Sequence, residues 1–254
     1  MSLPLNEQTV LVTGAGRGLG AAIAATFARE GASVAVNYRN SGKAAEELAS
    51  RLGGKASAFG ADVRDGEAVV QMVADVTARL GAPTTIVHNA LSDFSFNGDA
   101  RSKLDHLTWD EIAAHMETGV KGALNLIQAA APSMRERGFG RIVLIGTNLF
   151  QNPVVPYHDY TAAKAALLSL TRTAAAELGP SGITVNMVSG GLLRTTDASR
   201  ATPEAVFDLI AGSTPLRRVT TPEEMADAVL FFASPWSRAV TGQNLIVDGG
   251  LVFN

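Results

Sequence analysis

The chain has 254 residues, of which 46% are hydrophobic and 18% are charged, and its formal net charge is −3. This composition suits one large α/β domain with a sizeable core, and the absence of a basic tract argues against nucleic acid as a partner. The absence of cysteine excludes disulfides and cysteine-ligated zinc, and the lack of a signal-peptide pattern or long apolar run predicts a soluble, cytoplasmic protein with no membrane contact.

Short apolar runs alternate with longer, alanine-rich amphipathic segments along the chain. Because most of the runs lack polar alternation, we expect strands that are buried on both faces of a parallel sheet. In chain order the pattern predicts strands over 9–13, 33–38, 56–60, 84–88, 141–147, 183–188 and 244–247. It predicts helices over 18–30, 67–80, 108–134 and 157–178, and one more that follows the second strand and ends at about 52. The sequence therefore predicts a doubly wound parallel sheet (a Rossmann fold) in a single domain over residues 1–254.

Two stretches interrupt this alternation. Residues 90–107 are polar, aromatic and irregular, and residues 190–215 are rich in Gly, Thr and Arg, with one short helix expected near 203–210. Each follows a predicted strand, and open α/β sheets bind ligands beyond the carboxyl ends of their strands. The two stretches are therefore either substrate-facing loops or ordinary surface loops.

A glycine-rich turn, Thr13-Gly14-Ala15-Gly16-Arg17-Gly18-Leu19-Gly20, follows the first predicted strand directly. Its glycines allow the backbone to turn sharply and to approach a pyrophosphate without a Cβ in the way. The next helix begins here, and its N-terminus supplies N–H donors and a partial positive charge. This position between a strand and a helix is the context in which such a pattern indicates dinucleotide binding.

A second motif, Tyr160-Thr161-Ala162-Ala163-Lys164, places a tyrosine and a lysine on one face of a predicted helix. A tyrosine titrates near pKa ~10, too high for easy proton exchange at neutral pH. A lysine ammonium and an oxidised nicotinamide both favour the phenolate, so we expect them to lower this pKa. Alone, the pair would be a packed Tyr beside a solvated Lys; together with the glycine-rich turn it predicts proton transfer to a carbonyl oxygen.

These motifs, in this order, resemble the short-chain dehydrogenase/reductase family. Asp62-Val63 matches the family's adenine-contacting Asp, and His88-Asn89-Ala90 falls where the family has Asn-Asn-Ala-Gly. The stretches 182–186 and 241–250 match the last third of the family pattern. Within the family, the sequence is most similar to the β-ketoacyl-acyl carrier protein (3-oxoacyl-ACP) reductase branch.

The resemblance implies roles for three catalytic residues. Tyr160 would protonate the carbonyl oxygen as hydride arrives from the cofactor, and Lys164 would also hold the nicotinamide ribose. The third catalytic residue of the family is a Ser, and Thr147 stands at that position in this chain. A Thr hydroxyl can still donate a hydrogen bond to the substrate oxygen, although its methyl group restricts the rotamer.

The resemblance also implies a cofactor site. In it, Thr195 matches the family Thr that contacts the nicotinamide amide or a phosphate. The implied cofactor-binding residues are Gly14, Arg17, Gly18, Leu19, Gly20, Tyr38, Arg39, Asp62, Val63, Asn89, Ala90, Tyr160, Lys164, Gly191 and Thr195.

Charge at the end of the second strand indicates which cofactor is used. NAD-specific members have an Asp or Glu there, which holds the ribose 2′-hydroxyl. This chain has Tyr38 followed by Arg39, and Arg17 lies within the glycine-rich turn. Two guanidinium groups and no carboxylate suit a 2′-phosphate, so the sequence favours NADP(H) over NAD(H), with a solvated Arg39 as the alternative.

Several positions depart from the family pattern. Gly119 stands where the family has an Asn that supports a water linked to the Lys, so its backbone, a water or Thr118 would have to serve instead. Leu91 replaces a Gly, and Gly190 replaces a Pro. His88 replaces an Asn and is expected to be a structural hydrogen-bonding residue rather than a proton carrier. No other His forms a ligand spacing with carboxylates, so we predict no metal site.

The leading hypothesis is an NADPH-dependent carbonyl reductase acting on a 3-oxoacyl thioester of acyl carrier protein or coenzyme A. The basic residues that would grip acyl carrier protein are absent at Phe139 and Ser181, although Arg135 and Arg137 could compensate. A small ketone, sugar or secondary alcohol therefore remains an alternative substrate. A protein of another class, a catalytically impaired NADP(H)-binding sensor or scaffold, is the second alternative, motivated by Gly119. Relatives are commonly tetramers, so we expect a homotetramer, with a dimer as the fallback.

Overall fold

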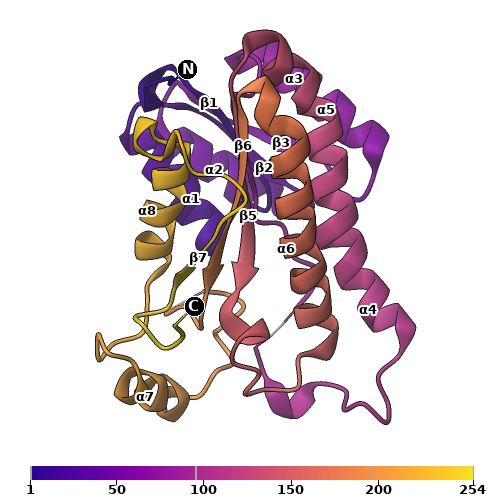
Figure 1. The fold of residues 1–254 in the computed structure, drawn as a ribbon, viewed down its shortest axis with the longest axis vertical. Helices are drawn as coiled ribbons and strands as arrows, with labels where there is room; N and C mark the ends of the chain where they lie inside the picture. Colours follow the sequence, from indigo (N-terminus) through magenta and orange to yellow (C-terminus); the bar gives the residue numbers. More distant parts are fainter. Residues whose placement is uncertain (1, 95, 195, 254) are drawn as a thin grey trace.

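A seven-stranded parallel sheet forms the centre of the molecule in the computed structural model, which describes residues 2–94, 96–194 and 196–253 (Figure 1). Its strands are β1 (Thr9–Val12), β2 (Ser33–Tyr38), β3 (Ala56–Gly60), β4 (Thr85–His88), β5 (Gly140–Thr147), β6 (Ile183–Gly190) and β7 (Asn244–Val247). The helices are α1 (Gly18–Arg29), α2 (Gly42–Leu52), α3 (Gly66–Leu80), α4 (Trp109–Met116), α5 (Gly122–Arg137), α6 (His158–Leu178), α7 (Glu204–Ser213) and α8 (Pro222–Ala233). This arrangement confirms the predicted doubly wound α/β fold.

The strand order β3-β2-β1-β4-β5-β6-β7 places the point of reversal beside β1. The chain leaves β1 toward β2 and β3, and then crosses to the other side of β1 to form β4. Val12 in β1 accordingly pairs with Val36 in β2 and with Val87 in β4. Loops after β1 and β4 diverge at such a point, and the crevice between them is where doubly wound sheets bind ligands.

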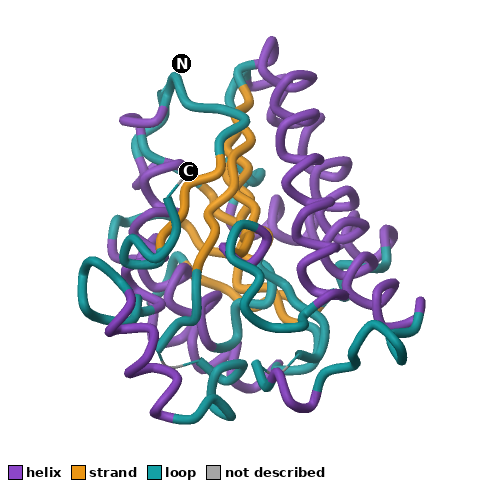
Figure 2. Tube along the Cα trace, turned by 60° about the horizontal axis from the view of Figure 1, so that its bottom comes forward, coloured by secondary structure: helices purple, strands orange, loops and turns teal. Residues whose placement is uncertain are grey.

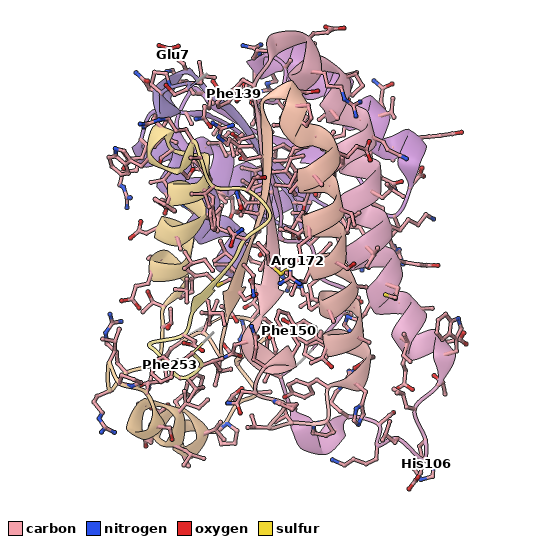
Figure 3. The ribbon with its side chains drawn as sticks, in the orientation of Figure 1. Glu7, His106, Phe139, Phe150, Arg172 and Phe253 are labelled. Atoms are coloured by element: carbon pink, nitrogen blue, oxygen red, sulfur yellow. The ribbon has the colours of Figure 1, made fainter. Side chains whose placement is uncertain are left out.

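Side chains of each strand alternate between two apolar layers, because successive Cβ atoms point to opposite faces of a sheet. In β1, Val10 and Val12 pack with α1, α2 and α8, whereas Leu11 packs with α3, α5 and α6. The helices therefore cover the sheet on both sides, as Figure 2 shows, and side chains fill the space between the layers (Figure 3). Burial on both faces explains why the strands read as near-continuous apolar runs.

The helix expected over 108–134 differs from the prediction. A capping box between Thr108 and Glu111 starts α4, but residues Glu117–Lys121 form a π-helical turn (η3) that separates α4 from α5. The second part then continues past 134 to Arg137 and ends at Gly138, which adopts φ 65°. Single π-helical turns within helices occur frequently at functional sites, and this one contains Gly119.

The helix α8 was not expected from the sequence. It begins with Pro222 and is fixed by a second capping box, between Thr221 and Glu224. Its buried Met225 and Val229 lie one turn apart and pack against the sheet. The short helix expected near 203–210 is present as α7, from Glu204 to Ser213. Within residues 2–94, 96–194 and 196–253, no helix is both long and apolar enough to span a bilayer.

Candidate active site

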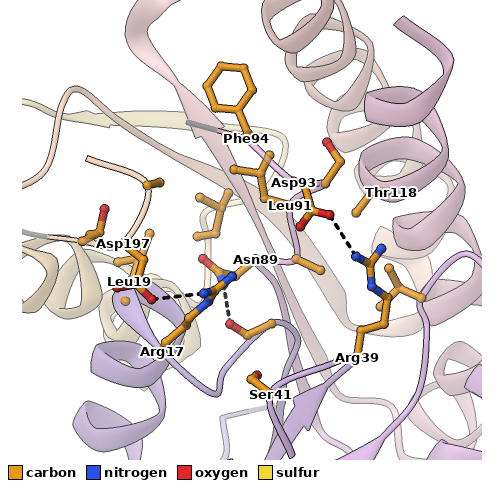
Figure 4. A pocket seen from close by; sticks show the side chains of 18 of the residues that line it. Arg17, Leu19, Arg39, Ser41, Asn89, Leu91, Asp93, Phe94, Thr118 and Asp197 are labelled. Carbon is orange, nitrogen blue, oxygen red and sulfur yellow. Dashed lines mark hydrogen bonds and ion pairs between the residues drawn. The ribbon is translucent and has the colours of Figure 1, made fainter. Parts of the chain in front are cut away.

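A cavity of about 760 Å³ opens at the carboxyl edge of the sheet, at the reversal point beside β1 (Figure 4). Segments that follow several strands contribute to its wall. Of the residues predicted for the site, those lining the cavity are Gly14, Arg17, Gly18, Leu19, Tyr38, Arg39, Asp62, Val63, Asn89, Ala90, Tyr160, Lys164 and Gly191. Thr195 lies outside the described residues.

The glycine-rich turn forms the floor of this cavity. Gly14 and Gly18 adopt φ values of 60° and 55°, which side-chain-bearing residues rarely adopt. A Cβ at Gly20 would lie 2.4 Å from the Gly14 carbonyl oxygen, so only glycine fits there. The Asn89 side-chain amide donates to the carbonyls of Thr13 and Gly14, at 3.1 and 3.2 Å, and so ties the segment after β4 to the turn after β1.

Two arginines line the cavity, Arg39 directly after β2 and Arg17 in the glycine-rich turn. Arg39 lies on one side and pairs with Asp93 at 3.6 Å, and Arg17 pairs with Asp197 at 3.3 Å (Figure 4). Asn40 and Ser41, which sequence reasoning missed, also line the cavity next to Arg39. The position of Ser41, directly after Arg39 and Asn40 at the end of β2, is the signal that could have identified it, and its side chain makes no capping hydrogen bond to α2. No carboxylate occurs from Asn37 to Ser41.

Asp62 lies on the wall of the cavity. Its carboxylate accepts hydrogen bonds from the Arg64 side chain, including one of 2.6 Å between Nη2 and Oδ2. This hydrogen bonding is the largest influence on the carboxyl group and lowers its pKa. The neighbouring Val63 is held through its carbonyl, which accepts from Asn125 Nδ2 at 2.8 Å. The Asp62-Val63 segment is thus fixed in place on the cavity wall.

The three predicted catalytic side chains meet at the other end of the cavity. Tyr160 and Lys164 lie one turn apart on α6, and the Lys164 Nζ is 5.7 Å from the centre of the Tyr160 ring. Thr147, the last residue of β5, hydrogen-bonds the Tyr160 side chain. Lys164 Nζ donates to the Ile145 carbonyl oxygen at 2.6 Å. All three side chains are buried.

Burial shifts the pKa values of this group in opposite directions. It raises the pKa of Tyr160 to about 12, although the Thr147 hydrogen bond acts against the rise. It lowers the pKa of Lys164 to about 8. The lowered tyrosine pKa expected from the sequence is therefore wrong for the chain alone. The Lys164 ammonium is directed to a backbone carbonyl, so desolvation of the phenolate is the larger effect.

His88 lies behind these residues and bonds at both ring nitrogens. The Thr13 hydroxyl accepts from the Asn89 and Ala90 amides, at 3.0 and 3.1 Å, and its own proton is directed to His88 Nδ1 at 3.1 Å. Nε2 then carries the proton and donates to the Gly119 carbonyl oxygen at 2.9 Å. Burial lowers the pKa of His88 to about 4, so the ring is neutral at pH 7. These contacts give His88 the structural role expected for it.

The π-helical turn also places a polar side chain, that of Thr118, at the cavity wall. Thr118 precedes Gly119, lines the cavity and has a buried hydroxyl with no hydrogen-bond partner among the described residues. A buried hydroxyl without a partner is costly, so a water or ligand atom is expected to satisfy it. Thr118 is therefore available for the hydrogen bonding that Gly119 cannot provide through a side chain.

Both irregular stretches contribute to the cavity wall. Residues 91–94 and Phe96 come from the first stretch, and Leu193 and residues 196–198 come from the second. The Phe94 ring stacks on the Tyr160 ring, with 4.9 Å between centres. Leu91 lies on the same wall. Each stretch therefore contributes its first residues to the candidate site, and substrate-facing loops remain our prediction for both.

The chain is similar to known proteins over nearly its whole length. Residues 14–252 match the family model described as enoyl-(acyl carrier protein) reductase. The 3-oxoacyl-acyl-carrier-protein reductase FabG of Staphylococcus epidermidis is 32% identical over 96% of this chain and 99% of its own. The L-rhamnose 1-dehydrogenase (NAD(P)(+)) of Azotobacter vinelandii is 36% identical, covering 98% of each chain. The crystal structure of a blue fluorescent protein from a metagenomic library, in complex with NADPH, is 35% identical, with TM-score 0.87 over 99% of this chain and 100% of the other.

The matches, the sheet topology and the glycine-rich turn agree. The chain belongs to the short-chain dehydrogenase/reductase family, as its sequence motifs indicated. It is an oxidoreductase that acts on CH–OH and C=O groups.

Proposed function

We propose that the cavity binds NADP(H), with the adenosine at the Asp62 end and the nicotinamide near Tyr160. Three features of the cavity fit this cofactor. Its floor is the glycine-rich turn, in which Gly14 and Gly18 adopt positive φ values, its wall carries the guanidinium groups of Arg17 and Arg39, and the end of β2 has no carboxylate that would repel a 2′-phosphate. Charge-assisted hydrogen bonds from guanidinium groups are strong and suited to phosphate.

Each part of the cavity then has a role in holding the cofactor. The backbone of the glycine-rich turn and the N-terminus of α1 would hold the pyrophosphate. Asp62 and Val63 would contact the adenine, with Asn89 and Ala90 beside the adjacent ribose. Lys164 would hold the nicotinamide ribose, and the segment from Gly191 through Thr195 would contact the nicotinamide. Bound NADPH supplies a hydride to the carbonyl carbon of the substrate.

The chain's own residues supply the proton and orient the carbonyl. With a pKa of about 12, Tyr160 is protonated at neutral pH and can donate its proton to the developing alkoxide. Thr147 donates to the same oxygen and fixes the position of the carbonyl. Lys164 stays mostly protonated at pH 7, since its pKa is about 8, and its charge would stabilise the phenolate that remains after transfer.

We further propose that the substrate is a 3-oxoacyl thioester of acyl carrier protein or coenzyme A, reduced to the 3-hydroxyacyl form. The similarity to 3-oxoacyl-acyl-carrier-protein reductase over nearly the whole chain supports this substrate. The apolar wall of Leu91, Phe94 and Phe96 suits an acyl chain. Arg135 and Arg137, in the last turn of α5, are candidate contacts for acyl carrier protein.

The second candidate is a sugar or another small hydroxylated ketone or secondary alcohol. It is favoured by the similarity to an L-rhamnose 1-dehydrogenase, which is as extensive as that to the thioester reductase. With either substrate, the reacting carbonyl would occupy the same position relative to Tyr160 and Thr147. The candidates differ only in the part of the substrate that extends away from Tyr160.

The decisive experiment measures NADPH consumption with acetoacetyl-coenzyme A, for the unaltered protein and for Tyr160→Phe. We expect turnover that is lost in the variant, while the variant still folds and still binds NADPH. If neither protein consumes NADPH with the thioester, the same assay is repeated with hydroxylated ketones and sugars. Binding of NADPH without turnover on any of these carbonyls would favour the sensor or scaffold hypothesis.

We propose a homotetramer as the working assembly. Leu124 on α5 and Leu245 on the edge strand β7 are exposed at 42% and 39%, so each presents apolar surface on an element suited to pairing. An edge strand with an apolar outward side chain tends to associate unless it is covered. Sedimentation equilibrium of the protein, compared with Leu124→Glu and Leu245→Glu, tests this. A protein that sediments as a monomer would exclude the proposal.

A further inference from the structure

Four polar residues form a cluster next to Tyr160 that the proposed chemistry does not use. The polar cluster consists of Ser92, Arg101, His115 and Asp159, drawn from the first irregular stretch, α4 and the first turn of α6. Asp159 and His115 are only 2% and 5% exposed. Asp159 directly precedes Tyr160, so the cluster is attached to the same helical turn as the proposed proton donor.

The contacts within the polar cluster connect the buried Asp159 carboxylate to the cavity wall. Asp159 Oδ2 forms an ion pair with Arg101 Nη2 and lies 3.4 Å from His115 Nε2. On the other side, Ser92 Oγ lies 2.8 Å from His115 Nδ1 and 3.3 Å from Nε2. Ser92 is the member that lines the cavity. The carboxylate favours a proton on Nε2, which leaves Nδ1 as an acceptor for the Ser92 hydroxyl.

Aromatic rings surround the polar cluster. Phe94 lies between the Arg101 guanidinium, 4.5 Å from its ring centre, and the Tyr160 ring, 4.9 Å away. The His115 ring meets Phe94 edge-on at 5.2 Å. The polar cluster therefore lies behind the aromatic wall of the site, and Ser92 brings a hydroxyl into the wall segment between Leu91 and Phe94.

Stability alone is a weak reason for such an arrangement. Burying two opposite charges costs desolvation that their attraction only partly offsets, and apolar residues of equal volume often stabilise a protein as well or better. The effect of the ion pair is instead to fix His115, and through His115 the Ser92 hydroxyl, at the cavity wall. A hydroxyl offers one donor and two acceptor positions, so Ser92 keeps hydrogen-bonding capacity for a ligand after bonding His115.

We propose that Ser92 is a specificity-determining residue that hydrogen-bonds a second oxygen of the substrate, with His115 and Asp159 as positioning residues behind it. The site then takes carbonyl compounds that carry another oxygen close to the reacting carbonyl and discriminates against plain ketones. The thioester carbonyl of a 3-oxoacyl thioester is one source of this oxygen, and a hydroxyl of a hydroxylated ketone is the other. This inference rests on the proposed reductase function and extends it to the substrate class.

The test compares matched substrates. For the unaltered protein and Ser92→Ala, kcat/KM with NADPH is measured for acetoacetyl-coenzyme A, for 4-hydroxy-2-butanone and for 2-butanone, which lacks the second oxygen. Sites built to bond a substrate oxygen reject analogues lacking it by large factors, so we expect the ratio of oxygenated to plain ketone to fall roughly tenfold or more in Ser92→Ala. Whichever oxygenated substrate shows the fall identifies the source of the oxygen.

Two further variants separate recognition from structure. Ser92→Thr keeps the hydroxyl and should keep the selectivity ratio, whereas His115→Phe keeps a ring in the aromatic wall and should lower the ratio by removing the group that orients Ser92. Ser102→Ala is the matched control, because Ser102 lies in the same stretch and donates to Glu111 rather than facing the cavity. It should leave the ratio unchanged.

The outcomes distinguish this inference from the reductase proposal. A ratio that is the same in Ser92→Ala as in the unaltered protein, or equal losses on all substrates, would overturn the role of Ser92. If the protein reduces none of the three compounds, the thioester form of the reductase proposal fails, and calorimetric titration of 4-hydroxy-2-butanone and 2-butanone into the NADP+-loaded protein decides the inference. Preferential binding of the hydroxyketone that Ser92→Ala abolishes would still support it, and binding without this dependence would overturn it.

Discussion

Replacing Arg39 by Ala should weaken NADPH binding and leave NADH binding nearly unchanged. A hydrogen bond to a charged group contributes about 1.5–3 kcal/mol, which corresponds to roughly 10- to 150-fold in affinity. The Arg39 side chain is 33% exposed, so solvent screening favours the lower part of this range, about 10- to 30-fold. Its ion pair with Asp93 adds little to the free energy of folding, because Asp93 is 91% exposed. The loss should therefore appear in the affinity for the 2′-phosphate.

The assay is titration of each variant with NADPH and with NADH, followed by the change in cofactor fluorescence. Arg29→Ala is the control, since Arg29 forms a surface ion pair with Asp227 and does not line the cavity. We expect the NADPH-to-NADH affinity ratio to fall about 10- to 30-fold for Arg39→Ala and not at all for the control. Equal weakening of both cofactors would refute the reasoning, because Arg39 would then support the site without recognising the phosphate.

Three further predictions concern Gly119, His88 and Arg101. Gly119→Asn should fold with an equal or higher melting temperature and keep its turnover, since no described atom outside its own helix backbone lies within 4 Å of a Cβ there; a clear loss of either would contradict this. Because the folded-state pKa of His88 is lowered to about 4 from 6.5, its contribution to stability is present above pH 6.5 and is lost as pH falls toward 4, on the order of 3 kcal/mol in all. Urea unfolding at pH 7 and pH 4.5 should show a smaller pH-dependent loss for His88→Asn than for the unaltered protein or the exposed control His106→Asn. Arg101→Met should lower the free energy of unfolding at pH 7 by about 3–5 kcal/mol, because it leaves buried Asp159 uncompensated, and adding Asp159→Asn should restore most of it; a single variant as stable as the unaltered protein would count against a buried ion pair.

The sheet and most helices could be predicted from the sequence because their signals are local. A run such as Ile142–Ile145 is apolar without alternation, and glycine at the end of a helix marks the stop. The signals for α8 were also local. Pro222 at the first helical position, Glu224 three residues after Thr221, and the i,i+4 pair Met225 and Val229 together describe a capped amphipathic helix.

Other features depend on contacts between distant residues and could not be predicted. The residue types of the π-helical turn at Glu117–Lys121 do not distinguish it from an α-helix, since the residues on both sides continue a helical pattern. The pairing of Asp159 with Arg101 joins positions 58 apart in the chain. The direction of the Tyr160 pKa shift also depends on how completely the folded chain buries the phenol, which the motif does not reveal.

Three departures from the family pattern lie in ordered surroundings in the folded chain, which argues for a maintained site. His88 and Gly119 each stand where the family has Asn, and a 2.9 Å hydrogen bond from His88 Nε2 to the Gly119 carbonyl joins them. Gly190 stands where the family has Pro, and a Cβ there would lie only 2.7 Å from the Met225 sulfur. Both sites are accommodated by close packing or hydrogen bonding, while Thr147 hydrogen-bonds Tyr160 and the Lys164 Nζ lies 5.7 Å from the centre of the Tyr160 ring. This pattern favours a reductase with an altered substrate wall over a protein that only binds the cofactor.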